Sequence, residues 1–113
     1  MTKETFETCL VKHAEEIENI KQAAHEQHRS VNQTYGEGLP YSYHRDMVVN
    51  NVVEFGYLVC ASENDVLPLI FGAYYHDSIE DARLTYNDVM NTARTMMTEE
   101  QALMATEIVY ALI

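Results

Sequence analysis

The densest group of residues that could do chemistry is the segment His76-Asp77-Ser78-Ile79-Glu80-Asp81. On a helix, Glu80 lies one turn beyond His76 and Asp81 lies one turn beyond Asp77, so four titratable groups gather within two turns. Three of the four are acids at the C-terminal end of the predicted helix, where the helix dipole disfavours negative charge. A divalent cation would offset this charge, and a solvated acidic surface is the alternative.

A second histidine, His44, stands at the start of another predicted helix. A short turn at Ser62–Asn64 predicts that this helix and the one leading to His76 form an antiparallel pair. The pairing would bring His44 close to His76 and Asp77. Two histidines and one carboxylate on facing helices are a suitable ligand set for Mn²⁺, Fe²⁺ or Zn²⁺.

The apolar spacing predicts an all-α fold, a single domain over residues 1–113 built as a bundle of about five helices. The expected helices cover about Thr5–Arg29, about Arg45–Ala61, Val66 to His76, Tyr86 to about Met97, and the segment from Thr98 onward. Thr85 and Asp88 have the spacing of a capping box at the start of the fourth helix. No segment has a convincing strand pattern.

Several side chains carry expectations of their own. The residues Val48, Val52, Phe55 and Val59 recur at spacings of four, three and four, which predicts one buried stripe. Asp65 is expected to cap the helix that starts at Val66. His13 and His25 are expected to be exposed on the first helix, and Cys9 and Cys60 to be small buried residues, because two cysteines this far apart make neither a disulfide framework nor a zinc knuckle.

Composition limits the classes of function. The chain has 113 residues with 7 Lys+Arg and 18 Asp+Glu, which gives a formal net charge of −11. Such an acidic surface repels nucleic acids and anionic membranes, so we expect neither as a partner. The apolar run Val66–Tyr75 is about half of what a bilayer span requires. The first residues have no basic and apolar leader pattern, so we expect a cytoplasmic protein.

The last helix ends on the apolar run Tyr110-Ala111-Leu112-Ile113 without a cap or a basic last turn. Two explanations stay open: the chain continues beyond this point, or a partner covers the end, as a second copy would in a homo-oligomer.

Taken together, these motifs resemble the HD-domain phosphohydrolase superfamily, and within it the RelA/SpoT-type (p)ppGpp hydrolase domain. The likeness runs from about Ala23 to Ile113, and the His-Asp-x-x-Glu-Asp segment is its most diagnostic part. The similar segments are His28-Arg29 with Glu37–His44 (family pattern H-R…G-x-P-Y-x-x-H), Phe71–Asp81 (A-x-L-H-D-x-x-E-D), Thr85–Val89 and Glu107–Leu112.

The resemblance implies an HD-domain helical bundle and a metal-dependent phosphohydrolase. His44, His76 and Asp77 would be the metal ligands, with Mn²⁺ as the first candidate and Fe²⁺ or Zn²⁺ as the others. Glu80 and Asp81 would match the acidic pair that positions and activates water for attack on phosphorus. The implied substrate is a small phosphorylated compound, with a nucleotide as the first choice.

The sequence departs from the family pattern in three ways. No residue matches the family's fourth ligand, an Asp on a later helix. The segment Ser30–Thr34 is uncharged where the (p)ppGpp hydrolases carry basic residues, and Arg45 stands where the family usually has Pro. A catalytically incomplete HD-fold module that binds a nucleotide or a protein partner is therefore the alternative function. A third is an acidic helical protein that competes for nucleic-acid-binding partners.

Overall fold

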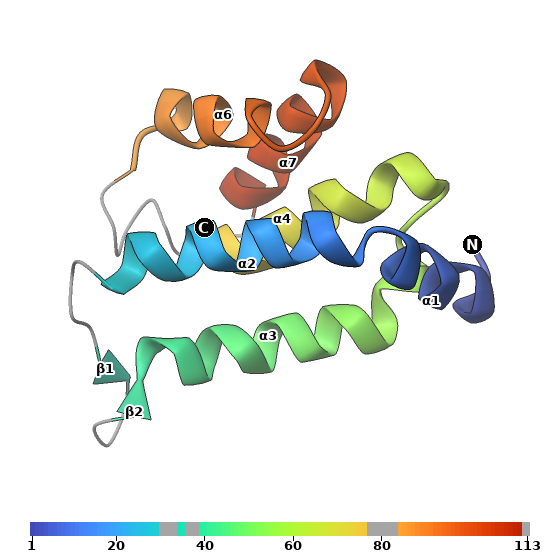
Figure 1. Ribbon diagram of the computed structural model, residues 1–113, viewed down its shortest axis with the longest axis horizontal. Helices are drawn as coiled ribbons and strands as arrows, with labels where there is room; N and C mark the ends of the chain where they lie inside the picture. The colour runs from blue at the N-terminus through green and yellow to red at the C-terminus, as the bar shows by residue number, and fades with distance from the viewer. Residues whose placement is uncertain (30–33, 36–38, 77–83, 112–113) are drawn as a thin grey trace.

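The computed structural model describes the backbone of residues 1–29, 34–35, 39–76 and 84–111, and the side chains of 1–26, 48–76 and 84–111. Within these ranges the fold is helical, as predicted, with six α-helices against the expected five (Figure 1). They are α1 (Lys3–Lys12), α2 (Ala14–Arg29), α3 (Tyr41–Phe55), α4 (Val66–Tyr75), α6 (Tyr86–Arg94) and α7 (Glu99–Ala111).

Four short elements complete the described chain. Two 3₁₀ helices, η1 (Gly56–Leu58) and η2 (Glu63–Asp65), connect α3 to α4. Strands β1 (Thr34–Tyr35) and β2 (Leu39–Pro40) form an antiparallel ribbon immediately before α3, with Thr34 opposite Pro40. Each strand is two residues long, which is too short to produce an alternating sequence pattern.

Helix α4 is the centre of the molecule. Every residue of α4 except Leu69 is buried, and the helix contacts α1, α2, α3 and α7. Its sequence is apolar on all sides, so it is stable in water only when neighbouring helices cover all of it. Phe71 and Tyr75 stack on one another inside this core, with ring centroids 4.3 Å apart. The helix begins at Val66, as predicted.

A glycine lets α4 and α7 pack closely. A Cβ atom at Gly72 would collide with Cγ2 of Ile108 and would lie 3.2 Å from its Cβ. Small or β-branched residues form the rest of the buried face of α7, including Ala102, Ala105 and Thr106. The Thr106 hydroxyl, on this buried face, donates to the carbonyl oxygen of Ala102 at 2.8 Å, so this buried polar group has a partner.

The predicted capping box starts α6. Thr85 Oγ1 accepts from the Asp88 amide at 3.2 Å, and Asp88 Oδ2 accepts from the Thr85 amide at 3.0 Å. The backbone hydrogen bond from Thr85 to the carboxylate, with a contribution from the Thr85 side chain, lowers the pKa of Asp88 below its usual value. Across the α6–α7 pair, the Tyr86 hydroxyl donates to Glu107 at 2.8 Å. The pair is therefore held by both local and long-range contacts.

The prediction of one continuous first helix is wrong, because the chain breaks at His13 between α1 and α2. His13 lies on the same stripe as the buried Phe6, Cys9 and Ile20. The expectation that His13 is exposed is also wrong, since its side chain is only 19% exposed, whereas His25 is exposed as predicted. A polar ring at this position of the stripe needs partners.

Two carboxylates provide those partners. His13 Nδ1 lies 3.0 Å from Glu16 Oε1 on α2, and His13 Nε2 lies 3.1 Å from Glu63 Oε1 on η2. Lys12 Nζ also binds Glu63 Oε1, at 2.8 Å. Carboxylates only accept, so both ring nitrogens can donate only when the ring is an imidazolium. The bond to Glu16, with that to Glu63, raises the pKa of His13, and partial burial opposes this rise.

The segment between α3 and α4 differs from prediction in two ways. Helix α3 ends at Phe55 rather than near Ala61, and Gly56 turns the chain into η1. A Cβ at Gly56 would lie 2.7 Å from Cζ of Phe6, so the close packing of α1 requires glycine here. Asp65 does not cap α4: its Oδ2 accepts from the Ala61 amide at 2.8 Å and closes a capping box at η2.

The predicted buried stripe is wrong at two of its four positions. Val48 and Val52 are partly buried, but Phe55 is 53% exposed and Val59 is 72% exposed. The pattern fails because the helix that it assumes ends at Phe55. Cys9 and Cys60, in contrast, are buried and free, as predicted.

Replacing Gly72 by Ala should destabilise the protein. Alanine has the better helix propensity by about 1 kcal/mol, but overpacking a core costs about 1–3 kcal/mol. We therefore expect a net loss of unfolding free energy, measured by urea unfolding followed by circular dichroism. In the double variant with Ile108→Ala, the loss should be smaller than the sum of the two single losses. Strictly additive losses would contradict this contact.

The contacts of His13 should make stability depend on pH. The folded-state pKa lies above the unfolded value of about 6.5, so the stabilisation is complete below that value and is lost as pH rises through the folded-state pKa. Between about pH 5.5 and pH 8.5, wild type should lose about 1 kcal/mol or less relative to His13→Gln, because solvent screens the contacts. Urea unfolding at both pH values measures the difference. His25→Gln should follow wild type; equal pH slopes for wild type and His13→Gln would refute the assignment.

Candidate functional site

Helices α3 and α4 place the two candidate histidines at the same end of the molecule. The helices contact one another and run in roughly opposite directions (Figure 1). His44 is in the first turn of α3, and His76 directly follows the last residue of α4. The connection through η1 and η2, from Gly56 to Asp65, is longer than the predicted turn at Ser62–Asn64, but the helices it joins pair in opposite directions, as predicted.

His76 is held by the end of the central helix. Its backbone has helical angles, φ −56° and ψ −30°, and it follows the buried residues Tyr74 and Tyr75. The side chain itself is half-buried, so it sits at the boundary between the core and the surface. Because α4 is covered on all sides, the backbone that carries His76 is fixed by packing.

The hydrogen bond of His76 determines which ring nitrogen carries the proton. Nδ1 lies 2.8 Å from the carbonyl oxygen of Ala73, one turn earlier on α4. A carbonyl oxygen only accepts, so Nδ1 must donate. In the neutral ring, the lone pair is then on Nε2. Metal-ligating histidines commonly donate their second ring N–H to a carbonyl or a carboxylate in this way.

The remaining predicted site residues cannot be placed. Asp77, Glu80 and Asp81 lie outside the described residues, and the side chain of His44 is not among the described ones. Within the described part of the chain, no group of three or more His, Cys, Asp or Glu side chains is arranged to hold a metal ion. The predicted ligand set includes side chains outside that part of the chain and stays a prediction.

One cluster of titratable groups was missed by the sequence reasoning. His13, Glu16, Glu63 and Lys12 come together only because η2 folds against the α1–α2 junction. The signal that could have found it is the position of His13 on the apolar stripe with Ile17 and Ile20. A histidine there must reach a polar partner on another element. All four groups are paired with one another, which is the pattern of a structural contact.

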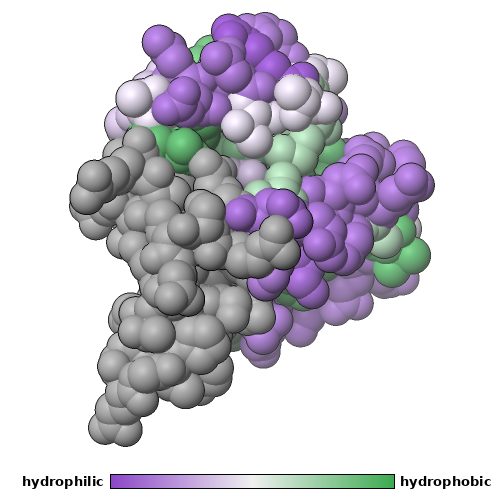
Figure 2. Space-filling view, turned by 60° about the vertical axis from the view of Figure 1, so that its left-hand side comes forward, coloured by the Kyte–Doolittle hydropathy of each residue, from purple (hydrophilic) through white to green (hydrophobic). Residues whose placement is uncertain are grey.

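One face of the molecule is mostly polar over its described residues. Figure 2 shows a face on which hydrophilic side chains cover most of the described surface and hydrophobic ones form small, separate areas. Among the described helices, none has both the length and the apolar character needed to cross a lipid bilayer.

Comparisons with known proteins were made at three levels. No protein-family model, no curated protein sequence and no solved structure matches this chain. The relation to the HD-domain superfamily thus rests on the motifs quoted above and stays a prediction.

Proposed function

We propose that this protein is an HD-type, metal-dependent phosphohydrolase that acts on a nucleotide or another small phosphorylated compound. The observation that carries the proposal is the bond from His76 Nδ1 to the Ala73 carbonyl oxygen, at 2.8 Å. It orients the ring and leaves the lone pair of the neutral ring on Nε2, at the end of a helix that packing holds in place. Asp77, the other half of the His-Asp doublet, is the next residue in the chain.

The donor chemistry fits a divalent cation. In the proposal, His44 and His76 provide imidazole nitrogens and Asp77 provides a carboxylate, a set suited to Mn²⁺, Fe²⁺ or Zn²⁺. The cation, when bound, neutralises phosphate oxygens and lowers the pKa of water in the site. Glu80 and Asp81 orient that water and accept its proton. The antiparallel arrangement of α3 and α4 supports the pairing of the two histidines.

Charge supports the need for a cation. The chain carries a formal net charge of −11, and the candidate segment itself contains three acids in six residues. A phosphorylated substrate is an anion and would be repelled by such a segment. A bound divalent cation would offset two of the three negative charges of the segment and would provide a positive centre for phosphate oxygens.

The alternative proposal is a catalytically incomplete HD-fold module that binds a nucleotide or a protein partner. It is favoured by one observation within the chain: Arg45 directly follows the candidate ligand His44, where the family usually has Pro. The two proposals differ in whether the purified protein holds metal and turns over substrate.

Metal content is the first test. Wild-type protein dialysed against trace Mn²⁺ should retain metal at close to one equivalent, measured by elemental analysis. His76→Ala should lose the metal. Removing a residue that only orients a metal ligand weakens binding by up to about 100-fold, so removing the ligand itself should weaken it by more. The matched control is His25→Ala, which removes an exposed histidine on α2. Equal metal in wild type and His76→Ala would refute His76 as a ligand, and no metal in any protein would favour the incomplete module.

Hydrolysis is the second test. Wild-type protein with Mn²⁺ should release phosphate or pyrophosphate from at least one member of a panel of nucleoside and sugar phosphates. Asp77→Ala should reduce that rate by more than about 100-fold while the helical circular dichroism stays unchanged. Glu15→Ala, at an exposed acid on α2, is the matched control and should keep the full rate. Full turnover by Asp77→Ala would sink the enzyme assignment.

A further inference from the structure

Exposed large apolar side chains are concentrated in one short segment. Among the described residues, four of the six such side chains lie between Val53 and Val59, at the end of α3 and in the residues after it. Leu58 is 68% exposed and Val59 is 72% exposed. Single exposed apolar residues are ordinary, but a contiguous group of this kind marks an interaction site.

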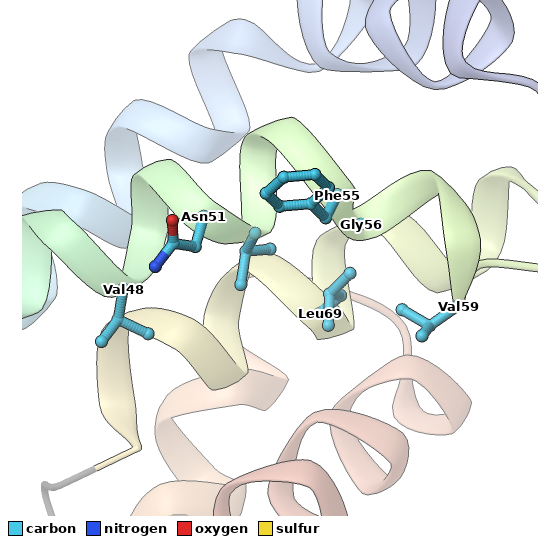
Figure 3. Close-up of a pocket in the computed structure, with 7 residues that line it drawn as sticks. Val48, Asn51, Phe55, Gly56, Val59 and Leu69 are labelled. Carbon is cyan, nitrogen blue, oxygen red and sulfur yellow. The ribbon is translucent and has the colours of Figure 1, made fainter.

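These residues border an apolar groove. A hollow of about 320 Å³ is lined by side chains that include Val48, Val52, Phe55 and Leu69. Figure 3 shows Val48, Phe55, Val59 and Leu69 projecting around it from α3, the segment after it and α4. A second hollow, of about 400 Å³, shares Val59 and Leu69 with the first. The two hollows are therefore adjacent, and together they are called the groove.

The second hollow extends the groove from α4 to α7. It is lined by Met104 and Ile108 of α7 and by Asp65 of η2. The groove therefore lies between helices from three parts of the chain. It also contains Phe55 and Val59, the two positions of the apolar stripe that the fold leaves exposed. Exposed apolar side chains at helical spacing can pack against the apolar face of another helix.

The scarcity of polar groups in the groove selects a helix as its occupant. Its polar lining side chains are Asn51 and Asp65. Asp65 Oδ2 already accepts from the Ala61 amide at 2.8 Å and the Ser62 amide at 3.2 Å. An extended peptide would bury N–H and C=O groups with almost nothing to bind them. A helix satisfies its own backbone and presents only side chains.

Charge determines the kind of helix. Asp65 is the charged residue among the groove's described lining. Two further exposed acids are close in sequence to residues that line the groove. Glu54 precedes Phe55, and Glu100 is one helical turn before Met104. A second copy of this chain would bring another formal charge of −11 to the contact and would be repelled. Lysine or arginine beside an apolar stripe would be attracted.

We infer that this groove is a docking site for an amphipathic helix of a partner protein, with apolar residues at i, i+3 or i+4, and i+7, flanked by lysine or arginine. Phe55 and Val59 cover one side of the bound stripe, and Leu69 and Met104 contact it from α4 and α7. Phe55 is the last residue of α3, whereas His44 is in its first turn, and the inference does not depend on the proposed hydrolysis.

The test uses two labelled model peptides of about 18 residues, five helical turns. Both carry the same leucine stripe, flanked by lysine in one and by glutamate in the other. Fluorescence anisotropy should show that the Leu/Lys peptide binds wild type and the Leu/Glu peptide does not. Phe55→Ser and Val59→Ser should each weaken the Leu/Lys complex by about tenfold or more, since central apolar contacts dominate such interfaces.

Val11→Ser is the matched control. Val11 is 78% exposed and lies in a shallow hollow with Glu4 and Glu7, on a different part of the surface. This variant should bind the Leu/Lys peptide as wild type does, which separates the groove from general attraction to an acidic protein. Phe55 and Val59 are exposed, so their variants should keep the circular dichroism of wild type.

Three results would overturn the inference. One is equal binding of the two peptides, which would remove the charge argument. Another is unchanged binding by both Phe55→Ser and Val59→Ser, which would place the peptide elsewhere. The third is a wild-type dimer in sedimentation equilibrium that Val59→Ser dissociates, which would make a second copy the occupant.

Discussion

The burial of nearly all of α4 is the constraint on which the rest of the structure depends. This helix has no polar face, so α1, α2, α3 and α7 must cover it together. The cover is close enough that α7 meets α4 at a position where only glycine fits, Gly72 against Ile108. This close packing also fixes the positions of the two ends of α4. One end is joined to η2 and its capping box, and the other end carries His76.

A helix end that packing holds in place is a suitable position for a side chain that must be oriented to bind a metal ion. The carbonyl oxygen of Ala73 accepts from His76 Nδ1, so the same helix sets both the position of the ring and its tautomer. The antiparallel partner α3 starts at this end with His44 in its first turn. In the proposed metal site, His76 is therefore held by a helix that the core already requires, and no additional element is needed to orient its ring.

Polar groups away from this end serve the fold. His13 interrupts the first helix and binds carboxylates on α2 and η2, which ties the N-terminal helices to the start of α4. Gly56 ends α3 where Phe6 of α1 needs space. That early end leaves Phe55 and Val59 outside the core, beside Leu69. The apolar groove is therefore a direct consequence of how α1 packs against the α3–α4 connection.

The sequence alone determined the helical class, the start of α4 at Val66 and the Thr85–Asp88 capping box, because these depend on local spacing and capping. It also predicted His44 and His76 as candidate ligands, and their role stays a prediction. It could not determine the break at His13, the exposure of Phe55 or the role of Asp65. Each depends on contacts with residues far away in the chain, such as Glu63 and Phe6. A local sequence pattern indicates which residues are apolar, but only tertiary packing decides which of them are buried.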